Sequence, residues 1–385
     1  MIGFPPPNFS ISLVTLCQEA TTMKKKLQLF ICFISTIVCS ISFLSWLPGI
    51  LLNKVDRLSL LAAGVMLPDG KVFEEKGDCQ VSNIVSTINF GQRNTVLASN
   101  TTDETLDNFL KNVPTFELSH NTNEPTYKIL ECMFGASGTK YQNFFINNKT
   151  SFDINVEETL KLPPDVSVKK DGTPQVLIVH THTSEAYMDK DQGFYYQDFS
   201  ARTTDPKFNV VQVGNAICQS LENCGIKTVH DTTIHDTPTF SGSYKRSAET
   251  IDKNLRKYPS ISVVLDIHRD TIENKERQKI KPTCSINGKK AAQVMIIAGC
   301  DTDGTLEHPD WQYNLRLALR LQRQIESMYP GMTRSLLFKN ARYNMHKTHG
   351  SLLIEVGSDA NTLNEAVLSG LYLGKALAAT LDGLS

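Results

Sequence analysis

The chain lacks a large net charge of either sign. Its 39 Lys and Arg residues nearly balance its 40 Asp and Glu residues, which leaves a formal charge of −1 at pH 7 over 385 residues. Domains that bind nucleic acid usually carry a clear basic excess. Aromatic residues are also scarce, at 8% with only two tryptophans, and no RNA-binding or helix-turn-helix signature is present. We therefore expect no nucleic-acid partner.

Closely spaced cysteine pairs are also absent. None of the nine cysteines forms a C-x-x-C pair, so the sequence contains no zinc-ribbon or redox motif. The last six cysteines could pair in an oxidising compartment, although their spacing does not indicate it. Cys218 and Cys300 have the size and polarity of small core residues.

A long apolar stretch stands near the start of the sequence. Residues 27–53 carry no charged side chain and directly follow Lys24, Lys25 and Lys26. Roughly 20 apolar residues in a helix span a hydrocarbon core of about 30 Å. The stretch is longer than the apolar region of a signal peptide, and the residues around Pro48 offer no small-x-small cleavage site. We therefore predict a transmembrane anchor over residues 27–52, with a cleaved signal peptide as the alternative.

The lysines also predict the orientation of this anchor. Positive charge accumulates on the cytoplasmic side of membrane spans, so residues 1–26 are expected in the cytoplasm and the rest of the chain outside. Trp46 would lie at the outer interface. The chain is thus predicted to be a single-pass protein of the cell membrane with an extracytoplasmic catalytic domain. Met23, just before the lysines, resembles a natural start, so an upstream mis-assigned start is an alternative.

The remaining sequence divides into two predicted parts, in line with a length that exceeds one ordinary domain. Residues 53–165 are rich in Asn, Thr, Ser and acidic residues and show no catalytic motif, which predicts a small irregular extracytoplasmic domain or stalk. Pro163 and Pro164, followed by a Gly-Thr-Pro sequence at 172–174, indicate a linker. Residues 166–385 are the predicted catalytic domain.

This second part alternates buried strands with amphipathic helices. Continuous apolar runs at 175–179, 261–267, 294–298 and 352–356 are typical of strands buried on both faces. Helical spacing appears around Ile217 and Ile251 and again over 311–329, and Thr362 with Glu365 forms a capping box that opens a last helix. The pattern predicts an α/β fold, a mainly parallel sheet with helices on both faces.

Metal-type residues stand at the ends of three of these strands. His182 and Glu185 follow the first strand, His268 ends the second, and Glu355 lies in the fourth. Ligands of parallel α/β sheets bind beyond the carboxyl ends of the strands. Catalytic zinc commonly has three protein ligands from His, Glu and Asp, with one position left for water. We therefore predict a Zn²⁺ site formed by His182, Glu185 and His268.

Other residues have predicted roles around this ion. Glu355 is the candidate general base, because a carboxylate near the water can accept its proton and pass it to the leaving amine. Asp266 would orient His268, or simply bond nearby backbone. Arg269 would hold a substrate carboxylate, or pair with Asp270. His180 lies on the same strand face as His182 and could replace it as ligand.

Five motifs of this region resemble the stage II sporulation protein P family, in that family's order. They are His180-Thr-His-Thr-Ser-Glu-Ala-Tyr187, Asp266-Ile-His-Arg-Asp270, Trp311-Gln-Tyr-Asn-Leu315, Arg342-Tyr-Asn344, and Gly350-Ser-Leu-Leu-Ile-Glu-Val-Gly-Ser358 with Asn361-Thr-Leu-Asn-Glu-Ala366. The likeness runs from about residue 174 to the C-terminus. Met345 departs from the pattern, which has a glutamine there.

The resemblance implies a zinc amidase-like fold and N-acetylmuramoyl-L-alanine amidase activity on peptidoglycan, with endopeptidase cleavage of stem-peptide crosslinks as a further activity. It implies remodelling of the septal and engulfment wall during sporulation, alongside the sporulation proteins D and M. By motif, His182, Glu185 and His268 match zinc positions and Glu355 matches the amidase glutamate. Of these three ligands, Glu185 agrees least with the wider group of zinc amidases. In those proteins the glutamate ligand often lies further along the sequence from the first histidine.

Two other functions compete with the amidase. A zinc carboxypeptidase or other peptidase shares the H-x-x-E pattern with a distant histidine. A non-catalytic wall-binding scaffold would use the histidines structurally, but such a protein is expected to have lost one of the zinc residues or Glu355, and all are present.

Overall fold

The computed structural model describes residues 103–135 and 137–384. The predicted cytoplasmic segment 1–26 and the predicted anchor 27–52 lie outside these residues. Within the described ranges, no helix combines the length and the apolar character that crossing a membrane requires.

An eight-stranded sheet forms the centre of the described fold. Its strands run in the order β2-β3-β11-β10-β12-β7-β4-β6, and all neighbours pair in parallel except β2 with β3 and β10 with β12. The strands are β2 (Thr139–Tyr141), β3 (Phe144–Asn148), β4 (Val176–Val179), β6 (Thr228–His230), β7 (Val263–Asp270), β10 (Val294–Cys300), β11 (Leu336–Asn340) and β12 (Gly350–Ser358). The predicted mixed α/β fold is confirmed.

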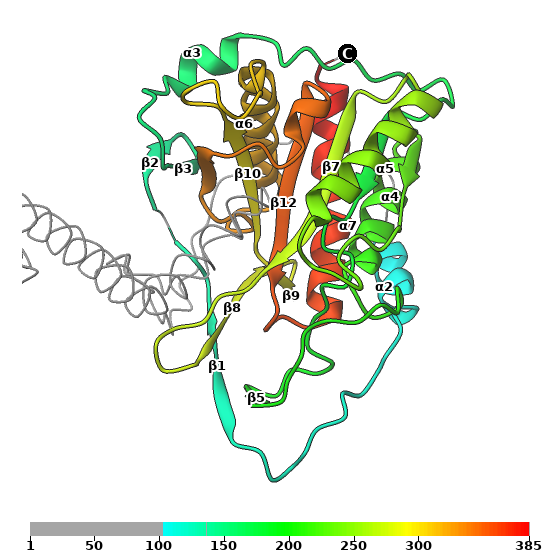
Figure 1. The fold of residues 1–385 in the computed structure, drawn as a ribbon, viewed down its shortest axis with the longest axis vertical. Coiled ribbons are helices and arrows are strands. Elements are labelled where there is room, and N and C mark those ends of the chain that lie inside the picture. Colours follow the sequence, from blue (N-terminus) through cyan, green and yellow to red (C-terminus); the bar gives the residue numbers. More distant parts are fainter. Residues whose placement is uncertain (1–102, 136, 385) are drawn as a thin grey trace, which may run out of the picture. The chain divides into compact units, whose positions relative to one another are not determined.

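Helices cover both faces of this sheet, as predicted. Val176 and Ile178 of β4 pack in the large core with α4 and α7, whereas Leu177 and Val179 pack with Ile251 of α5 on the opposite face. Figure 1 shows α6 and α7 behind the central strands. The long helices are α4 (Val211–Asn223), α5 (Ser243–Lys257), α6 (Trp311–Met328) and α7 (Leu363–Asp382). Alternate side chains of β4 are thus buried on both faces, which explains its uninterrupted apolar sequence.

Helix α7 begins where the sequence indicates. The Thr362 side chain accepts a hydrogen bond from the backbone N–H of Glu365, and the Glu365 carboxylate accepts one from the backbone N–H of Thr362. This reciprocal pair is the predicted capping box, and it satisfies two backbone donors at the start of the helix.

A second sheet of four strands was not predicted. It has the order β5-β1-β8-β9, formed by β1 (Thr126–Cys132), β5 (Phe194–Tyr196), β8 (Lys279–Ile286) and β9 (Lys289–Ala292). Lysines along β8 and β9 interrupt the apolar pattern. For this reason the two strands do not appear in the sequence as continuous apolar runs. The turn between them is Asn287-Gly288, with positive φ at both residues, and this dipeptide is a strong hairpin signal that would have identified them.

The described part of the predicted small domain joins these sheets. Strand β3 pairs with β11 in the main sheet, and β1 pairs with β8 in the second. Helix α2 (Asp103–Lys111) contacts α7, and α3 (Val156–Lys161) contacts α6. Among the described residues, the predicted division at residue 165 therefore does not separate two folded units, because strands on either side of it share hydrogen bonds.

Candidate active site

The three strands that carry the predicted site residues are neighbours in the sheet, in the order β12-β7-β4. Glu355 of β12 is the register partner of His268 of β7, and Asp266 is the partner of Val179 at the end of β4. Side chains alternate along a strand, and Val264 of β7 packs on the α5 face. Asp266, His268 and their neighbour Glu355 therefore project from that same face, near the carboxyl ends of the strands.

The turn after β4 adds His182 and Glu185 to this group. Asp236 holds the turn, because its carboxylate accepts hydrogen bonds from the backbone N–H of Ser184 and, at 2.6 Å, from the Ser184 hydroxyl. Glu185 is buried, and its Oε2 accepts a hydrogen bond from the backbone N–H of Arg269 at 3.1 Å. The same oxygen lies 3.3 Å from Nδ1 of His268.

His182 and His268 lie close enough to share one ion. Their ring centroids are 5.3 Å apart. A Zn–N bond of about 2.0 Å places each ring centroid roughly 3 Å from the metal, so two histidine ligands stand up to about 6 Å apart. Nδ1 of His182 is buried without a hydrogen-bond partner among the described residues.

His268 is held between two carboxylates. Its Nε2 lies 2.9 Å from Oδ1 of Asp266, opposite the Nδ1 that faces Glu185. Asp266 is itself fixed by the backbone N–H and the hydroxyl of Thr181, at 2.8 and 2.6 Å. A carboxylate on one imidazole nitrogen, with the other nitrogen facing a second ligand group, is the arrangement that orients metal-binding histidines. The geometry therefore suits the orienting role predicted for Asp266.

The charges of this cluster depend on burial and on these ion pairs. Burial lowers the pKa of His182 to about 3, so its imidazole is neutral. Burial also disfavours the His268 imidazolium, but Asp266 and Glu185 outweigh it and raise the pKa of His268 well above 6.5. Burial works against ionised Glu185 too, yet the hydrogen bond to His268 lowers its pKa. Two carboxylates thus flank one imidazolium, that of His268.

Glu355 has a different electrostatic environment from Glu185. Burial and then the Asp270 carboxylate raise the pKa of Glu355 to about 8. The charge of Asp270 is balanced by Arg334, whose Nη1 donates to Asp270 at 2.7 Å. Oε2 of Glu355 is buried without a hydrogen-bond partner among the described residues. A raised pKa in a site of this kind is typical of a proton-transfer group.

These side chains fit a divalent ion in type, although they are not arranged around one. No group of three or more His, Cys, Asp or Glu in the described part of the chain has the geometry of a metal site. The reason is visible in the contacts, because His268 and Glu185 face each other as an ion pair and His182 stacks on Phe240, with centroids 4.2 Å apart. Nδ1 of His182 has no partner among the described residues, and carboxylates outnumber the positive charges of the cluster. Both features favour binding of a cation at the position that the His268 proton takes between His268 and Glu185.

His180, the alternative ligand, has both nitrogens engaged elsewhere. Its Nδ1 lies 2.9 Å from the Ile267 carbonyl, and its Nε2 lies 2.8 Å from Nε2 of His230. The His180–His230 pair packs on Gly214 of α4, where an added Cβ would lie 2.5 Å from the His230 ring. His180 therefore anchors the turn to α4, which leaves His182 as the better candidate ligand.

Arg269 differs from its predicted role. Its guanidinium is buried on the other side of β7 and donates to the backbone carbonyls of Ala186 and Ala201, at 3.0 and 2.7 Å, and to the Thr271 hydroxyl. These contacts leave it unable to bind a substrate carboxylate, and Asp270 pairs with Arg334 instead. These contacts differ from the predicted role because strand alternation turns residue 269 away from His268.

Arg269→Ala is therefore expected to destabilise the protein rather than to weaken substrate binding. Each buried carbonyl left without its donor costs about 1–3 kcal/mol, so the two carbonyls together predict a loss of roughly 2–6 kcal/mol in the free energy of unfolding. Denaturant unfolding of the variant would measure it. An unchanged stability together with a raised KM would restore the substrate-binding role.

Several residues around the site could not be identified from the sequence. Phe240 and Tyr244 flank the His182 ring, and Asp236 fixes its turn. The Arg202 guanidinium lies 4.9 Å from the centre of the Phe240 ring and donates to Asp236 at 2.9 Å. All four lie in or beside irregular segments, and only the tertiary fold brings them to the strand ends.

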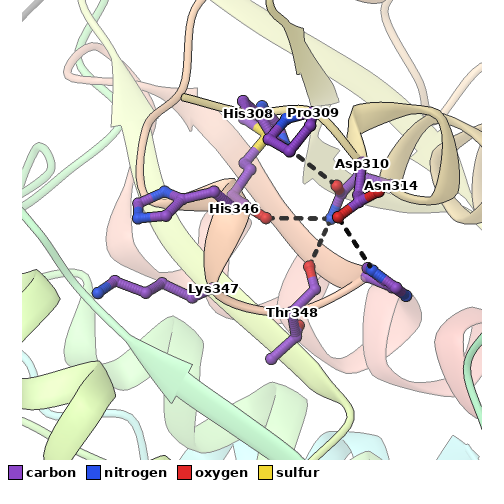
Figure 2. A pocket seen from close by; sticks show the side chains of 9 residues that line it. His308, Pro309, Asp310, Asn314, His346, Lys347 and Thr348 are labelled. Atoms are coloured by element: carbon purple, nitrogen blue, oxygen red, sulfur yellow. Dashed lines mark hydrogen bonds and ion pairs between the residues drawn. The ribbon is translucent and has the colours of Figure 1, made fainter. Parts of the chain in front are cut away.

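The remaining motifs are structural. Asn314 of α6 donates to the backbone carbonyls of Met345 and Thr348 (Figure 2). It also donates to the backbone carbonyl of Ser351. Asn344 donates to the Tyr244 carbonyl and the Ser247 hydroxyl. Met345, the departure from the family pattern, is buried, and its sulfur lies 3.3 Å from the backbone N of Gly299. Met345 therefore has a packing role and lies apart from the histidine cluster.

The other histidines make their contacts apart from the predicted ligands. His235 bonds the His180 carbonyl and Thr250, and His120 stacks on Tyr196. Three more surround a cavity of about 280 Å³ beside the start of α6 (Figure 2). Its lining comprises His308, Pro309, Asp310, Asn314, Met345, His346, Lys347, Thr348 and His349.

The fold and this cluster define an α/β protein with histidines and carboxylates gathered near the carboxyl ends of a mainly parallel sheet. Residues 99–378, most of the chain, match the family model of stage II sporulation protein P. The chain belongs to this family, as its motifs indicated.

The chain is also similar to solved structures of amidases. One is the apo form of the N-acetylmuramyl-L-alanine amidase Ami1 from Mycobacterium abscessus, with 14% identity and a TM-score of 0.31 over 55% of this chain and 98% of that one. Another is the CwlD amidase from Clostridioides difficile in complex with the GerS lipoprotein, with 11% identity and a TM-score of 0.33 over 55% and 98%. A comparison of the chain with curated protein sequences found no match.

Proposed function

We propose that the chain is a zinc-dependent N-acetylmuramoyl-L-alanine amidase that hydrolyses peptidoglycan during sporulation. Membership of the stage II sporulation protein P family supports this assignment. The observation that carries it is the placement of His182, Glu185 and His268 beside Glu355 at one end of the sheet. Three ligand-type side chains and a carboxylate with a raised pKa are the groups that metal-assisted amide hydrolysis requires.

In the proposed mechanism His182, Glu185 and His268 would hold a Zn²⁺ ion, and this ion would supply Lewis-acid activation of the water and of the scissile carbonyl. Asp266 keeps His268 in the orientation for binding, through its contact with Nε2. Glu355 accepts a proton from the attacking water and delivers it to the leaving nitrogen. Its raised pKa of about 8 brings the carboxyl close to neutral pH, where it can exist in both forms.

We further propose that residues 27–52 anchor the chain in the cell membrane and place this domain outside the cytoplasm, against the septal wall. The charge-free stretch after three lysines supports this placement. In that position the sporulation proteins D and M are the proposed partners.

Digestion of purified sacculi tests the proposed activity. The purified protein loaded with Zn²⁺ is expected to release stem peptides and leave free lactyl groups on muramic acid, and a chelator should stop the release. New ends within the stem peptides would instead identify an endopeptidase. Intact sacculi after incubation with protein of measured zinc content would contradict both activities.

A further inference from the structure

Tyr244 reaches the site from the start of helix α5. The helix follows Gly242, whose φ of 81° lies in the left-handed region that favours glycine. Helix α5 packs on β4, and its first turn therefore lies near the strand ends. The backbone carbonyl of Tyr244 accepts a hydrogen bond from the Asn344 side chain at 2.9 Å, which fixes the residue in place.

The Tyr244 ring lies beside both histidines of the cluster. Its centroid is 5.7 Å from that of His182, edge to face, and 6.5 Å from that of His268, in a stacked orientation. Tyr343 contacts its other side, with centroids 5.5 Å apart. The Tyr244 ring therefore lies in the same small volume as the two predicted histidine ligands.

Most other donors near this volume already have acceptors. The Arg269 guanidinium is bound to backbone carbonyls, and the Thr181 hydroxyl donates to Asp266. The Tyr187 hydroxyl donates to the Val356 carbonyl. By contrast, the Tyr244 hydroxyl makes no hydrogen bond to any residue that the structure describes. Burial raises the pKa of Tyr244 well above its usual value, so the hydroxyl carries its proton at neutral pH.

We propose that the Tyr244 hydroxyl is a catalytic donor that binds the carbonyl oxygen of the scissile amide. This inference rests on the proposed amidase function and adds the residue that stabilises the oxygen as it becomes negative. A donor placed in advance and without another partner is effective because it needs no rearrangement when the charge develops.

The proposed step balances without a further reactant. Water adds to the amide carbon, a C–O bond forms, and the carbonyl oxygen gains negative charge. Tyr244 shares its proton with that oxygen in a hydrogen bond and keeps it. The C–N bond then breaks, and the amine leaves with the proton that Glu355 took from the water.

Tyr244→Phe tests the role, because it removes the hydroxyl and keeps the ring beside His182. Loss of one such donor lowers kcat by about 10²–10³-fold. We expect this loss on a purified muropeptide, with KM, zinc content and melting temperature close to those of the wild type. The matched control is Tyr329→Phe, at the end of α6 and outside the site, which should keep the wild-type kcat.

The outcomes separate this inference from the proposed function. A wild-type kcat in Tyr244→Phe, with an active wild-type protein, would overturn the donor role and leave the amidase intact. A wild-type protein that binds zinc but does not cleave muropeptides would overturn both. A loss of kcat accompanied by a loss of zinc would show that Tyr244 only supports the histidines and would overturn the donor role as well.

Discussion

Replacing His268 by alanine is expected to abolish both stoichiometric zinc binding and hydrolysis. The imidazole lies between Glu185 and Asp266, so its removal takes away a proposed ligand and leaves two buried carboxylates facing each other. Metal analysis of the purified variant, followed by sacculus digestion, measures the two effects separately.

The control for this variant is His349→Ala. His349 is partly exposed and pairs with Asp165 at 2.6 Å, away from the cluster, so zinc content and activity should stay at wild-type levels. Retained hydrolysis by His268→Ala with metal still bound would refute the assignment of His268 as a ligand.

The second large effect is expected from Glu355→Gln. Glutamine has the shape of the carboxyl group but cannot accept the proton of the water, so turnover should fall by about 10²-fold or more. Zinc content should be unchanged, because Glu355 is not a proposed ligand. Glu158→Gln, on the exposed surface of α3, is the matched control. A variant with both metal and wild-type turnover would exclude Glu355 as the base.

The same substitution has a predicted effect on stability. Folding raises the pKa of Glu355 from 4.5 to about 8, so the folded chain binds its proton more tightly than the unfolded chain. In protein stripped of metal, this contribution to stability is present below pH 4.5 and is lost as the pH rises toward 8. Glutamine carries no charge, so stripped Glu355→Gln should melt at or above the temperature of stripped wild type at pH 8. A lower melting temperature would contradict the raised pKa.

The sheet and the edge that carries the candidate site were largely predictable from the sequence, because each central strand is buried on both faces. A run such as Val176–Val179 has few alternatives to a buried strand. The clustering of His268 and Glu355 followed from the rule that polar residues at the ends of parallel strands meet at one edge.

What could not be predicted depends on contacts between distant segments. Arg269 looked like a substrate ligand until strand alternation and the carbonyls of Ala186 and Ala201 gave it a structural role. Phe240 and Tyr244 reach His182 only because α5 packs on β4. Strands β1 and β3 join later strands across more than a hundred residues, which no local pattern could reveal.

The alternation along β7 has a consequence for how the protein can vary. Asp266 and His268 project from one face while Ile267 and Arg269 project from the other, so deleting a single residue within the strand would exchange the two sets. Arginine would then enter the histidine cluster, and an imidazole would enter the apolar layer. Within β7, therefore, only changes that keep the count of residues can preserve the site.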